Sequence, residues 1–369
     1  MAFDIGFLGG GQLARMSIQA AQRMGLKCIS LDPGEQTPAS ELAPAIAGSL
    51  DDPQCIAMLA SQCDRLALEN EFIPASALHE ALRLAKVKED RLIPSIDTLA
   101  IIQDKLLQRQ ALMAADVPSP QAIAIEGDGS EAISRIGFPM VLKARFGGYD
   151  GRGTRYARTM EEFQSHGHLW QAGGWLAESF VPFKRELAAM VFVDRNGNGG
   201  CFPTMETIQT NHVCDVVFPC GTNASDVAMA AVRAVDGQGL FGVEMFELED
   251  GSVQINELAP RPHNTGHYTL DWGGVSQFEQ HVRLVFDLPT IDPRGNGTCM
   301  ANLLGQPNSG DYRKGLFAAM KEESEARVHW YGKAESRPGR KMGHLNVVGN
   351  NCVERAKRAR EAFYRSWCL

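Results

Sequence analysis

The segment from Phe3 to Asp32 contains a strand, a glycine loop, a helix and a second strand, and it constrains the fold more than any other part of the chain. Phe3 to Leu8 is apolar and ends at three consecutive glycines, 9–11. Apolar residues then recur with helical spacing over 12–24, and a second apolar run, 27–31, closes on Asp32. Two strands joined by a helix form a parallel pair with a right-handed crossover. The sequence therefore predicts an open α/β sheet at the start of the chain.

The same alternation continues along the chain, which predicts the α/β (α+β) class. We expect a domain boundary near Pro94, followed by a capped helix that runs through Ala115. The other expected elements lie at 66–68, 75–84, 121–125, 130–136, 140–144, 175–180, 186–193, 226–238 and 353–364. With 369 residues, the chain is long enough for two or three domains.

Charge and cysteine usage exclude several classes of protein. The net charge is −8, so there is no general basic field to hold nucleic acid or an anionic membrane. No apolar run approaches the roughly 20 residues that a membrane span needs, and no basic leader precedes the first strand. The nine cysteines are scattered singly, without a C-x-x-C pair, which favours free thiols in a reducing compartment. We expect a cytoplasmic enzyme.

The segment 241–258 predicts a β-hairpin that brings two carboxylates together. Asp250-Gly251 is a two-residue turn signal between two apolar runs. Pairing outward from that turn places three pairs of side chains on one face: Leu248 with Val253, Phe246 with Ile255, and Glu244 with Glu257. The last pair sets two carboxylates opposite each other, about 5 Å apart between Cα atoms. On this register Asn256 points to the other face.

Two carboxylates that close repel each other by roughly 3 kcal/mol at an effective dielectric near 20. A shared proton, a neighbouring Lys or Arg, or a divalent cation would relieve the repulsion. Oxygen ligands without nearby His or Cys suit magnesium better than zinc. By itself the pattern fits a solvated surface hairpin equally well, and a register slip of one residue would separate the pair.

A glycine-rich loop after Lys143 is the second candidate site. Lys143 ends an apolar strand, and Arg145, Arg152 and four glycines follow within ten residues. Glycines let backbone amides converge on phosphate oxygens, and a lysine at the strand end supplies a fixed charge. The loop lacks a Walker sequence, and glycine-rich loops are more often plain turns.

Three further segments have both a functional and a structural interpretation. Glycines 9–11 with Ala14, and Asp32 at the end of the second strand, resemble a dinucleotide fingerprint. They support an NAD-dependent oxidoreductase as an alternative function, although a tight strand-to-helix turn explains them too. The segment 259–267 is dense in polar groups; its two histidines fit a structural role, but their place directly after the carboxylate hairpin makes them better candidates for the site. The segment 337–344 is a basic cluster, which without context a solvated turn explains.

The chain resembles the 5-(carboxyamino)imidazole ribonucleotide synthases, ATP-grasp ligases of purine biosynthesis, over nearly its whole length. The matching segments are GGGQLARM at 9–16, LDP at 31–33, KARFGGYDGRG at 143–153, ELAPRPHNTGHYT at 257–269, SQFEQHVR at 276–283 and RPGRKMGHLN at 337–346. This resemblance implies a Rossmann-like N-terminal domain (1–94), an ATP-grasp domain (95–292) with a lid subdomain at about 118–180, and a small C-terminal domain (293–369).

The resemblance also implies roles for individual residues. Contacts to the nucleotide phosphates are implied for Lys105, Lys143 and the loop of Gly147, Gly148, Tyr149, Gly151 and Gly153. Contacts to adenine and ribose are implied for Glu178, Ser179, Phe180, Val181 and Glu186, with Asn256 beside the nucleotide. Glu244 and Glu257 would be the magnesium ligands. The carboxylation and ribonucleotide site would comprise Tyr149, Asp150, Arg152, Arg261 and His263, with Lys333 and Arg340 on the ribonucleotide phosphate.

The implied reaction uses ATP and Mg²⁺ to phosphorylate bicarbonate to carboxyphosphate. Carboxyphosphate, or carbon dioxide released from it, then carboxylates the exocyclic amine of aminoimidazole ribonucleotide. Arg261 would stabilise the carboxyl group, and Asp150 and His263 are both candidates for handling the amine proton. The segment 69–71 lacks the Thr expected ahead of it, which leaves its role open. The resemblance implies a homodimer without nucleic acid or membrane partners, and another ATP-grasp carbon–nitrogen ligase is the nearest alternative.

Overall fold

An open parallel sheet begins the chain, as its first segment predicts. The computed structural model describes residues 1–148, 153–171, 173–307 and 310–367. The sheet has the order β3-β2-β1-β4-β5 and every pair in it is parallel. Its strands are β1 (Phe3–Leu8), β2 (Cys28–Asp32), β3 (Ala45–Ala47), β4 (Cys63–Leu68) and β5 (Leu92–Ile93). Its helices are α1 (Gln12–Arg23), α2 (Pro53–Ala60), α3 (Ala75–Ala85) and the short η1 (Glu89–Arg91).

Two helices, and not one, follow Pro94. They are α4 (Ile96–Gln103) and α5 (Lys105–Ala114), and the single helix expected to run through Ala115 is wrong. Asp104 interrupts it with an extended backbone, φ −95° and ψ 104°. Its carboxylate accepts the amide of Leu106 and binds the guanidinium of Arg145, so it caps α5 while it is held by a residue from another sheet.

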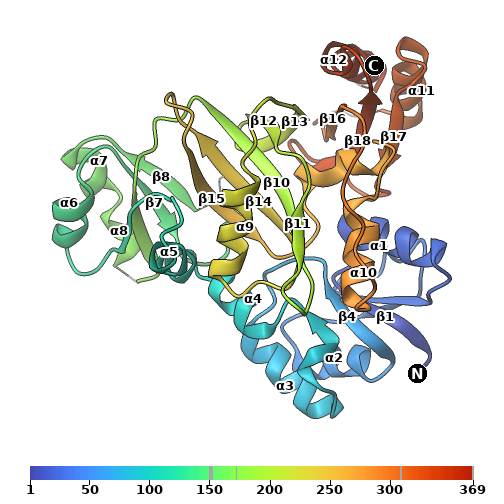
Figure 1. The fold of residues 1–369 in the computed structure, drawn as a ribbon, viewed down its shortest axis with the longest axis horizontal. Helices are drawn as coiled ribbons and strands as arrows, with labels where there is room; N and C mark the ends of the chain where they lie inside the picture. Colours follow the sequence, from blue (N-terminus) through green and yellow to red (C-terminus); the bar gives the residue numbers. More distant parts are fainter. Residues whose placement is uncertain (149–152, 172, 308–309, 368–369) are drawn as a thin grey trace.

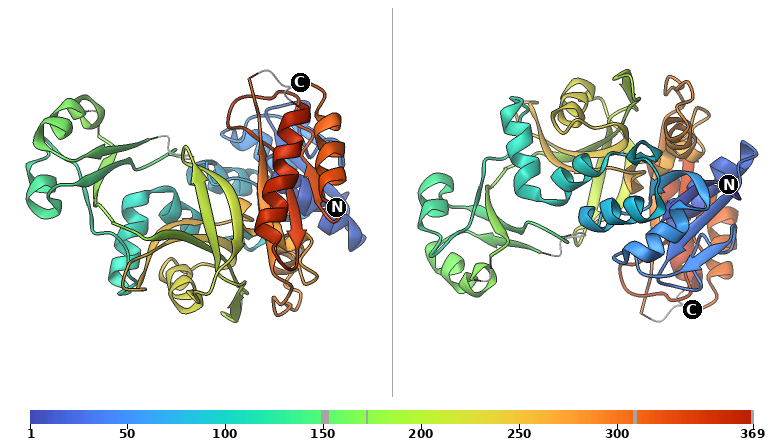
Figure 2. Two further views of the ribbon diagram at one scale, coloured as in Figure 1. Left: turned by 90° about the horizontal axis from the view of Figure 1, so that it is seen from above. Right: turned by 90° about the horizontal axis from the view of Figure 1, so that it is seen from below.

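A small antiparallel sheet projects from the body of the molecule (Figure 2). Its order is β6-β9-β7-β8. The strands are β6 (Ala122–Ala124), β7 (Met140–Ala144), β8 (Thr154–Ala157) and β9 (Trp175–Ser179), and the helices are α6 (Ser130–Ile136), α7 (Met160–Ser165) and α8 (Gly167–Trp170). Phe163 and Trp170 fill its separate core. All these elements fall within the range expected for a lid, about 118–180.

One nine-stranded sheet forms the centre of the molecule (Figure 1). Its order is β15-β14-β10-β12-β13-β16-β18-β17, with β11 paired to β10. The strands are β10 (Arg185–Val193), β11 (Gly199–Cys201), β12 (Met205–Thr210), β13 (Val213–Pro219), β14 (Gly239–Glu247), β15 (Val253–Ala259), β16 (Thr298–Leu304), β17 (Arg327–Trp330) and β18 (Lys341–Val348). Val216 pairs with Ala301, so the C-terminal strands continue the central sheet.

Five further helical segments cover this sheet and its C-terminal end. They are α9 (Ser225–Ala234), η2 (Asn264–Leu270), α10 (Gln277–Val285), α11 (Tyr312–Glu322) and α12 (Cys352–Trp367). α9 packs on one face of β14 and β15 through a core that includes Val243, Met245 and Ile255. The opposite face of that hairpin looks toward the small sheet and carries the candidate site. Among the helices described here, none has the length and apolar character to cross a membrane.

Candidate active site

Glu244 and Glu257 lie directly opposite each other on β14 and β15, as the hairpin pattern predicts. The register predicted nearer the turn, with Phe246 opposite Ile255, is wrong. In the structure Phe246 faces Gln254 and Met245 faces Ile255. The turn is longer than two residues, since it closes with the amide of Leu248 on the carbonyl of Ser252. A β-bulge between Glu244 and Met245 then absorbs the offset and restores the carboxylate pair.

The bulge also changes which side chains share the site. Ile255 is fully buried in the core under α9, so it does not lie on the carboxylate face as predicted. Asn256 lies on the site side, because its Oδ1 is 3.4 Å from the ammonium of Lys143. The extra residue therefore directs Asn256 and Glu257 toward the same space, where strict alternation would separate them.

One of the remedies expected for the carboxylate repulsion, a neighbouring lysine, is present in the site. Lys105 Nζ lies 2.7 Å from Glu257 Oε1, and this partner lowers the pKa of Glu257 although burial opposes the shift. Burial, followed by the charges of Glu257 and Glu186, raises the pKa of Glu244 to about 7. Their side chains are 30% and 39% exposed, so an incoming ligand can reach both carboxylates.

Lys143 belongs to a buried cluster of charges. Its Nζ lies 2.7 Å from Glu178 Oε2, and Arg109 Nε donates to Glu178 Oε1 at 2.8 Å. Burial opposes ionisation of Glu178, but Arg109 and Lys143 outweigh it and lower the pKa of that carboxyl to about 2. The Glu178 side chain therefore points into the protein, while Ser179 ends β9 and Phe180 beside it is exposed.

Glu186 lies on β10, the strand next to β14. Burial raises the pKa of its carboxyl, and it faces Phe246 across the strand pair. Phe246 stacks on Phe183 with ring centroids 4.6 Å apart and planes within 8°. An apolar platform next to a carboxylate suits a flat base attached to a sugar.

The polar segment after β15 packs against the glutamates that follow β4. Arg261 forms a two-pronged ion pair with Glu71, which gives the segment 69–71 a place in the site. Burial raises the pKa of neighbouring Glu69 to about 7 although Arg261 opposes the shift. His263 lies 3.8 Å from Glu244, and burial, then Arg261, lowers the pKa of its imidazole well below the usual value.

Gly242 is required beside His263. A Cβ on Gly242 would lie 2.5 Å from the Cβ of His263 and 2.7 Å from its Cγ. Nδ1 of His263 is 2.9 Å from Thr265 Oγ1, and its backbone amide donates to Gln277. The imidazole is thus held in one position over β14.

The remaining predicted residues lie in different places. The ammonium of Lys333 lies 5.6 Å from the ring centre of Tyr331. Its positive charge is one of those that lower the pKa of Glu69 against burial, so Lys333 lies on the N-terminal side of the site. Arg340 donates to the carbonyl of Glu335 in a partly exposed turn. Of the loop, Gly147, Gly148 and Gly153 are described. The predicted residues Tyr149, Asp150, Gly151 and Arg152 lie outside the described part of the chain.

The fingerprint interpretation of the first glycine loop is not supported by its contacts. The amide of Gly10 donates to one carboxylate oxygen of Asp32 and the amide of Gly34 donates to the other, both at 2.8 Å. Both oxygens of Asp32 therefore hold the backbone of this loop and its neighbour, which argues against a role in binding the ribose of NAD.

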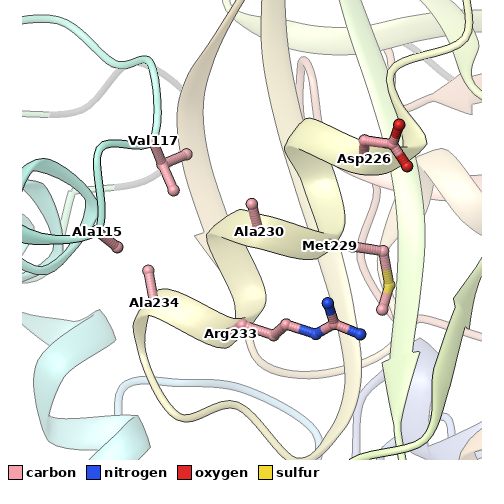
Figure 3. Close-up of a pocket in the computed structure, with 7 residues that line it drawn as sticks. All are labelled: Ala115, Val117, Asp226, Met229, Ala230, Arg233 and Ala234. Carbon is pink, nitrogen blue, oxygen red and sulfur yellow. The ribbon is translucent and has the colours of Figure 1, made fainter.

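Two hollows are prominent in the described structure. One, of about 490 Å³, opens between the N-terminal sheet and the hairpin, and its lining includes Glu71, Lys105, Phe146, Gly148 and Glu257. The other, of about 510 Å³, is a groove along α9, with Met229 and Ala230 between Asp226 and Arg233, and with Ala115 and Val117 facing the helix (Figure 3). It lies on the outer side of α9, away from the carboxylate pair.

Sequence reasoning missed three of the contacts that shape the site. Asp104 and Arg109 have no recognisable motif, and although Arg145 lies in the glycine-rich segment, nothing in the sequence shows that it pairs with Asp104. The only available signal for Asp104 and Arg109 was the presence of charged residues within a predicted helix, where both turn out to be buried.

Family comparisons agree with this arrangement. The model described as "ATP-grasp domain" matches residues 110–278, and "Ribonucleotide synthetase preATP-grasp domain" matches 2–103. "Phosphoribosylaminoimidazole carboxylase C-terminal domain" matches 298–358. A small sheet facing a large one across a lysine and a carboxylate pair, together with these matches, defines an ATP-grasp enzyme, an ATP-dependent ligase.

Similar proteins identify the family. N5-carboxyaminoimidazole ribonucleotide synthase of Synechococcus elongatus is 38% identical, and the match covers 96% of this chain and 92% of that protein. An ADP complex of N5-carboxyaminoimidazole ribonucleotide synthetase superposes with a TM-score of 0.88 at 31% identity, covering 99% of this chain and 98% of the other. The chain belongs to the N5-carboxyaminoimidazole ribonucleotide synthase family.

Two further relatives extend the comparison. The Aspergillus clavatus enzyme in complex with ADP and 5-aminoimidazole ribonucleotide matches with a TM-score of 0.87 at 29% identity, covering 99% of each chain. Phosphoribosylaminoimidazole carboxylase of Ogataea methanolica is 38% identical over 96% of this chain and 68% of that protein. The chain thus spans about two thirds of the length of this fungal carboxylase.

Proposed function

We propose that this protein uses ATP and bicarbonate to carboxylate the exocyclic amine of 5-aminoimidazole ribonucleotide, in purine biosynthesis. The product is 5-(carboxyamino)imidazole ribonucleotide, formed through carboxyphosphate. The observation that carries the proposal is the pairing of Glu244 with Glu257 beside Lys143, next to the ion pair of Arg261 and Glu71. The proposed phosphate-binding group, with Lys143 on β7, and the proposed carboxylate-binding group, with Arg261 just after β15, would thus lie next to the paired carboxylates.

Glu244 and Glu257 fit magnesium. Oxygen donors dominate, and burial followed by the charge of Glu257 raises the pKa of Glu244, a cost that a bound cation would offset. Within the described residues, no group of three or more His, Cys, Asp or Glu side chains forms a complete metal site, so phosphate oxygens of ATP would complete the ligand set. Bound magnesium would offset charge on those oxygens.

Lys143, Lys105 and the glycines at 147, 148 and 153 would bind the phosphates. Lys143 ends β7 at the start of the glycine loop, and Lys105 begins α5 beside Glu257. Ammonium groups held in a partly buried space offset the charge that develops during phosphoryl transfer. Glu186 and the stacked Phe183 and Phe246 would contact the nucleoside.

Arg261 and His263 would act on the acceptor side. Arg261 keeps its charge, and its guanidinium is held by Glu71, which lines the hollow between the N-terminal sheet and the hairpin. His263 is uncharged near neutral pH, so it is suited to accept the proton that the amine loses on carboxylation. Asp150 is the other candidate for this step. Lys333 and Arg340 would bind the ribonucleotide phosphate.

The test is ATP hydrolysis measured as release of ADP. We expect hydrolysis to require Mg²⁺ and bicarbonate and to be stimulated by 5-aminoimidazole ribonucleotide. Hydrolysis indifferent to both substrates would refute the proposal. Stimulation by a different amine from a small panel, with none by the ribonucleotide, would instead identify another carbon–nitrogen ligase.

A cytoplasmic homodimer completes the proposal. The described cysteines are all free thiols, which agrees with a reducing compartment. Light scattering coupled to size-exclusion chromatography would measure the mass, and a single monomer peak at micromolar concentration would contradict the dimer.

A further inference from the structure

The first two turns of α5 tie together parts of the site that come from different sheets. The matched family ranges end at 103 and resume at 110, so residues 104–109 lie outside both. Four of these six residues contact the site: Asp104 binds Arg145, Lys105 binds Glu257, Gln108 accepts the amide of Leu258, and Arg109 binds Glu178. One short helix therefore contacts the end of β7, β9 and β15.

Arg109 makes the most extensive of these contacts. Only 4% of the residue is exposed. Nε donates to Glu178 Oε1 at 2.8 Å, Nη1 to the carbonyl of Ile255 at 3.2 Å, and Nη2 to the carbonyl of Asn256 at 2.6 Å. Glu178 belongs to β9 of the small sheet, while Ile255 and Asn256 belong to β15 of the large one. A single guanidinium thus joins the two sheets.

The two carbonyls that Arg109 binds flank the β-bulge. A bulge interrupts the ladder of backbone hydrogen bonds, so its carbonyls need other partners. Arg109 donates a hydrogen bond to each of the two carbonyls, which belong to the residues directly before Glu257 in the chain. At its other end, Arg109 shares Glu178 with Lys143, whose Nζ is 2.7 Å from the second carboxylate oxygen. Arg109 is therefore linked to Lys143 through Glu178, and to Glu257 through the backbone of Asn256.

We propose that Arg109 is a positioning residue that holds Lys143 and Glu257 at a constant separation, so that one magnesium–nucleotide complex can engage both. The inference rests on the proposed function, because it takes these two residues as binding groups. A planar guanidinium reaches three acceptors in a fixed arrangement, whereas an ammonium cannot span them. Removing the guanidinium leaves Glu178 to Lys143 alone and takes a donor from the carbonyls of Ile255 and Asn256.

The experiment compares wild type with Arg109→Met and Arg109→Lys, using calorimetric titration with ADP and Mg²⁺ in the absence of turnover. Outer contacts of metal and ligand sites typically change affinity by about 10- to 100-fold. We expect Arg109→Met to weaken binding of magnesium–ADP by about that amount, and Arg109→Lys to recover part of it. In steady-state kinetics, the KM for ATP should rise while the KM for the ribonucleotide changes less than about twofold.

Arg355→Met is the matched control. Arg355 in α12 also combines carboxylate and carbonyl partners, since it binds Glu323, Glu325 and the carbonyl of Val348. Its loss should lower stability and leave ADP affinity unchanged. Arg109→Met with wild-type affinity, or an equal loss of affinity in Arg355→Met, would overturn the inference. If Arg109→Met does not fold, unchanged affinity in Arg109→Lys and Arg109→Gln overturns it equally.

These outcomes are separate from a failure of the proposed function. Wild-type protein whose ATP hydrolysis ignores bicarbonate and the ribonucleotide would refute that function. The titration with magnesium–ADP would still decide the role of Arg109, because it involves neither substrate.

Discussion

Replacing Glu244 by Gln should reveal the energetic cost of the carboxylate pair. In the folded protein the pKa of Glu244 is raised from 4.5 to about 7. A carboxyl with a raised pKa binds its proton more tightly in the folded state, so stability falls as pH rises from 4.5 through 7. One pKa unit corresponds to about 1.4 kcal/mol, so the full loss is roughly 3 kcal/mol, and most of it falls between pH 5 and pH 8.

The assay is urea unfolding of metal-free protein at pH 5 and pH 8. From pH 5 to pH 8, wild type should lose about 2–3 kcal/mol of unfolding free energy more than Glu244→Gln, which has no charge to desolvate. Magnesium with ADP should restore stability to wild type at pH 8 and much less to the variant. Glu249→Gln, an exposed glutamate in the same hairpin, is the control and should follow wild type. Parallel pH profiles for wild type and Glu244→Gln would refute the reasoning.

Three further predictions concern single residues of the site. Glu257→Gln removes one of the two opposed carboxylates, so magnesium-dependent ATP hydrolysis should fall by about 100-fold or more; near-normal turnover would end its assignment as a ligand. Gly242→Ala places a Cβ 2.5 Å from that of His263, so it should cost about 1–3 kcal/mol in urea unfolding and lower kcat; wild-type values for both would show that the contact relaxes freely. Arg340→Ala should raise the KM for the ribonucleotide about tenfold and leave the KM for ATP unchanged; equal effects on both would contradict a phosphate contact.

Several parts of the fold and site could be read from the sequence because their causes are local. The glycine loop after Leu8 and the helix that follows it predict the first parallel sheet, since strand and helix periodicities differ in a short window. Asp250-Gly251 predicts the hairpin, and parity along its strands brings Glu244 opposite Glu257. That pairing was correct although the turn register was not, because the bulge compensated for the longer turn.

Other features were decided only by tertiary structure. The break at Asp104 depends on Arg145, which approaches from another sheet, so helix propensity over 96–114 could not reveal it. The continuation of the central sheet into β16 depends on pairing between residues some 85 positions apart, such as Val216 and Ala301. Pairings at that separation leave no periodic signal in either strand.

The carboxylate hairpin shows both contributions in one place. The sequence by itself determined that a hairpin carries one glutamate on each of its strands, because the turn signal and the apolar runs beside it are local. The bulge that sets Glu244 directly opposite Glu257 is a feature of the folded sheet. Only the tertiary structure decided how their charges are held: Lys105 beside Glu257, burial around Glu244, and Arg109 on the carbonyls of the bulge. The physical reason is that burial and charge at a site depend on side chains from distant segments, whose approach no local pattern records.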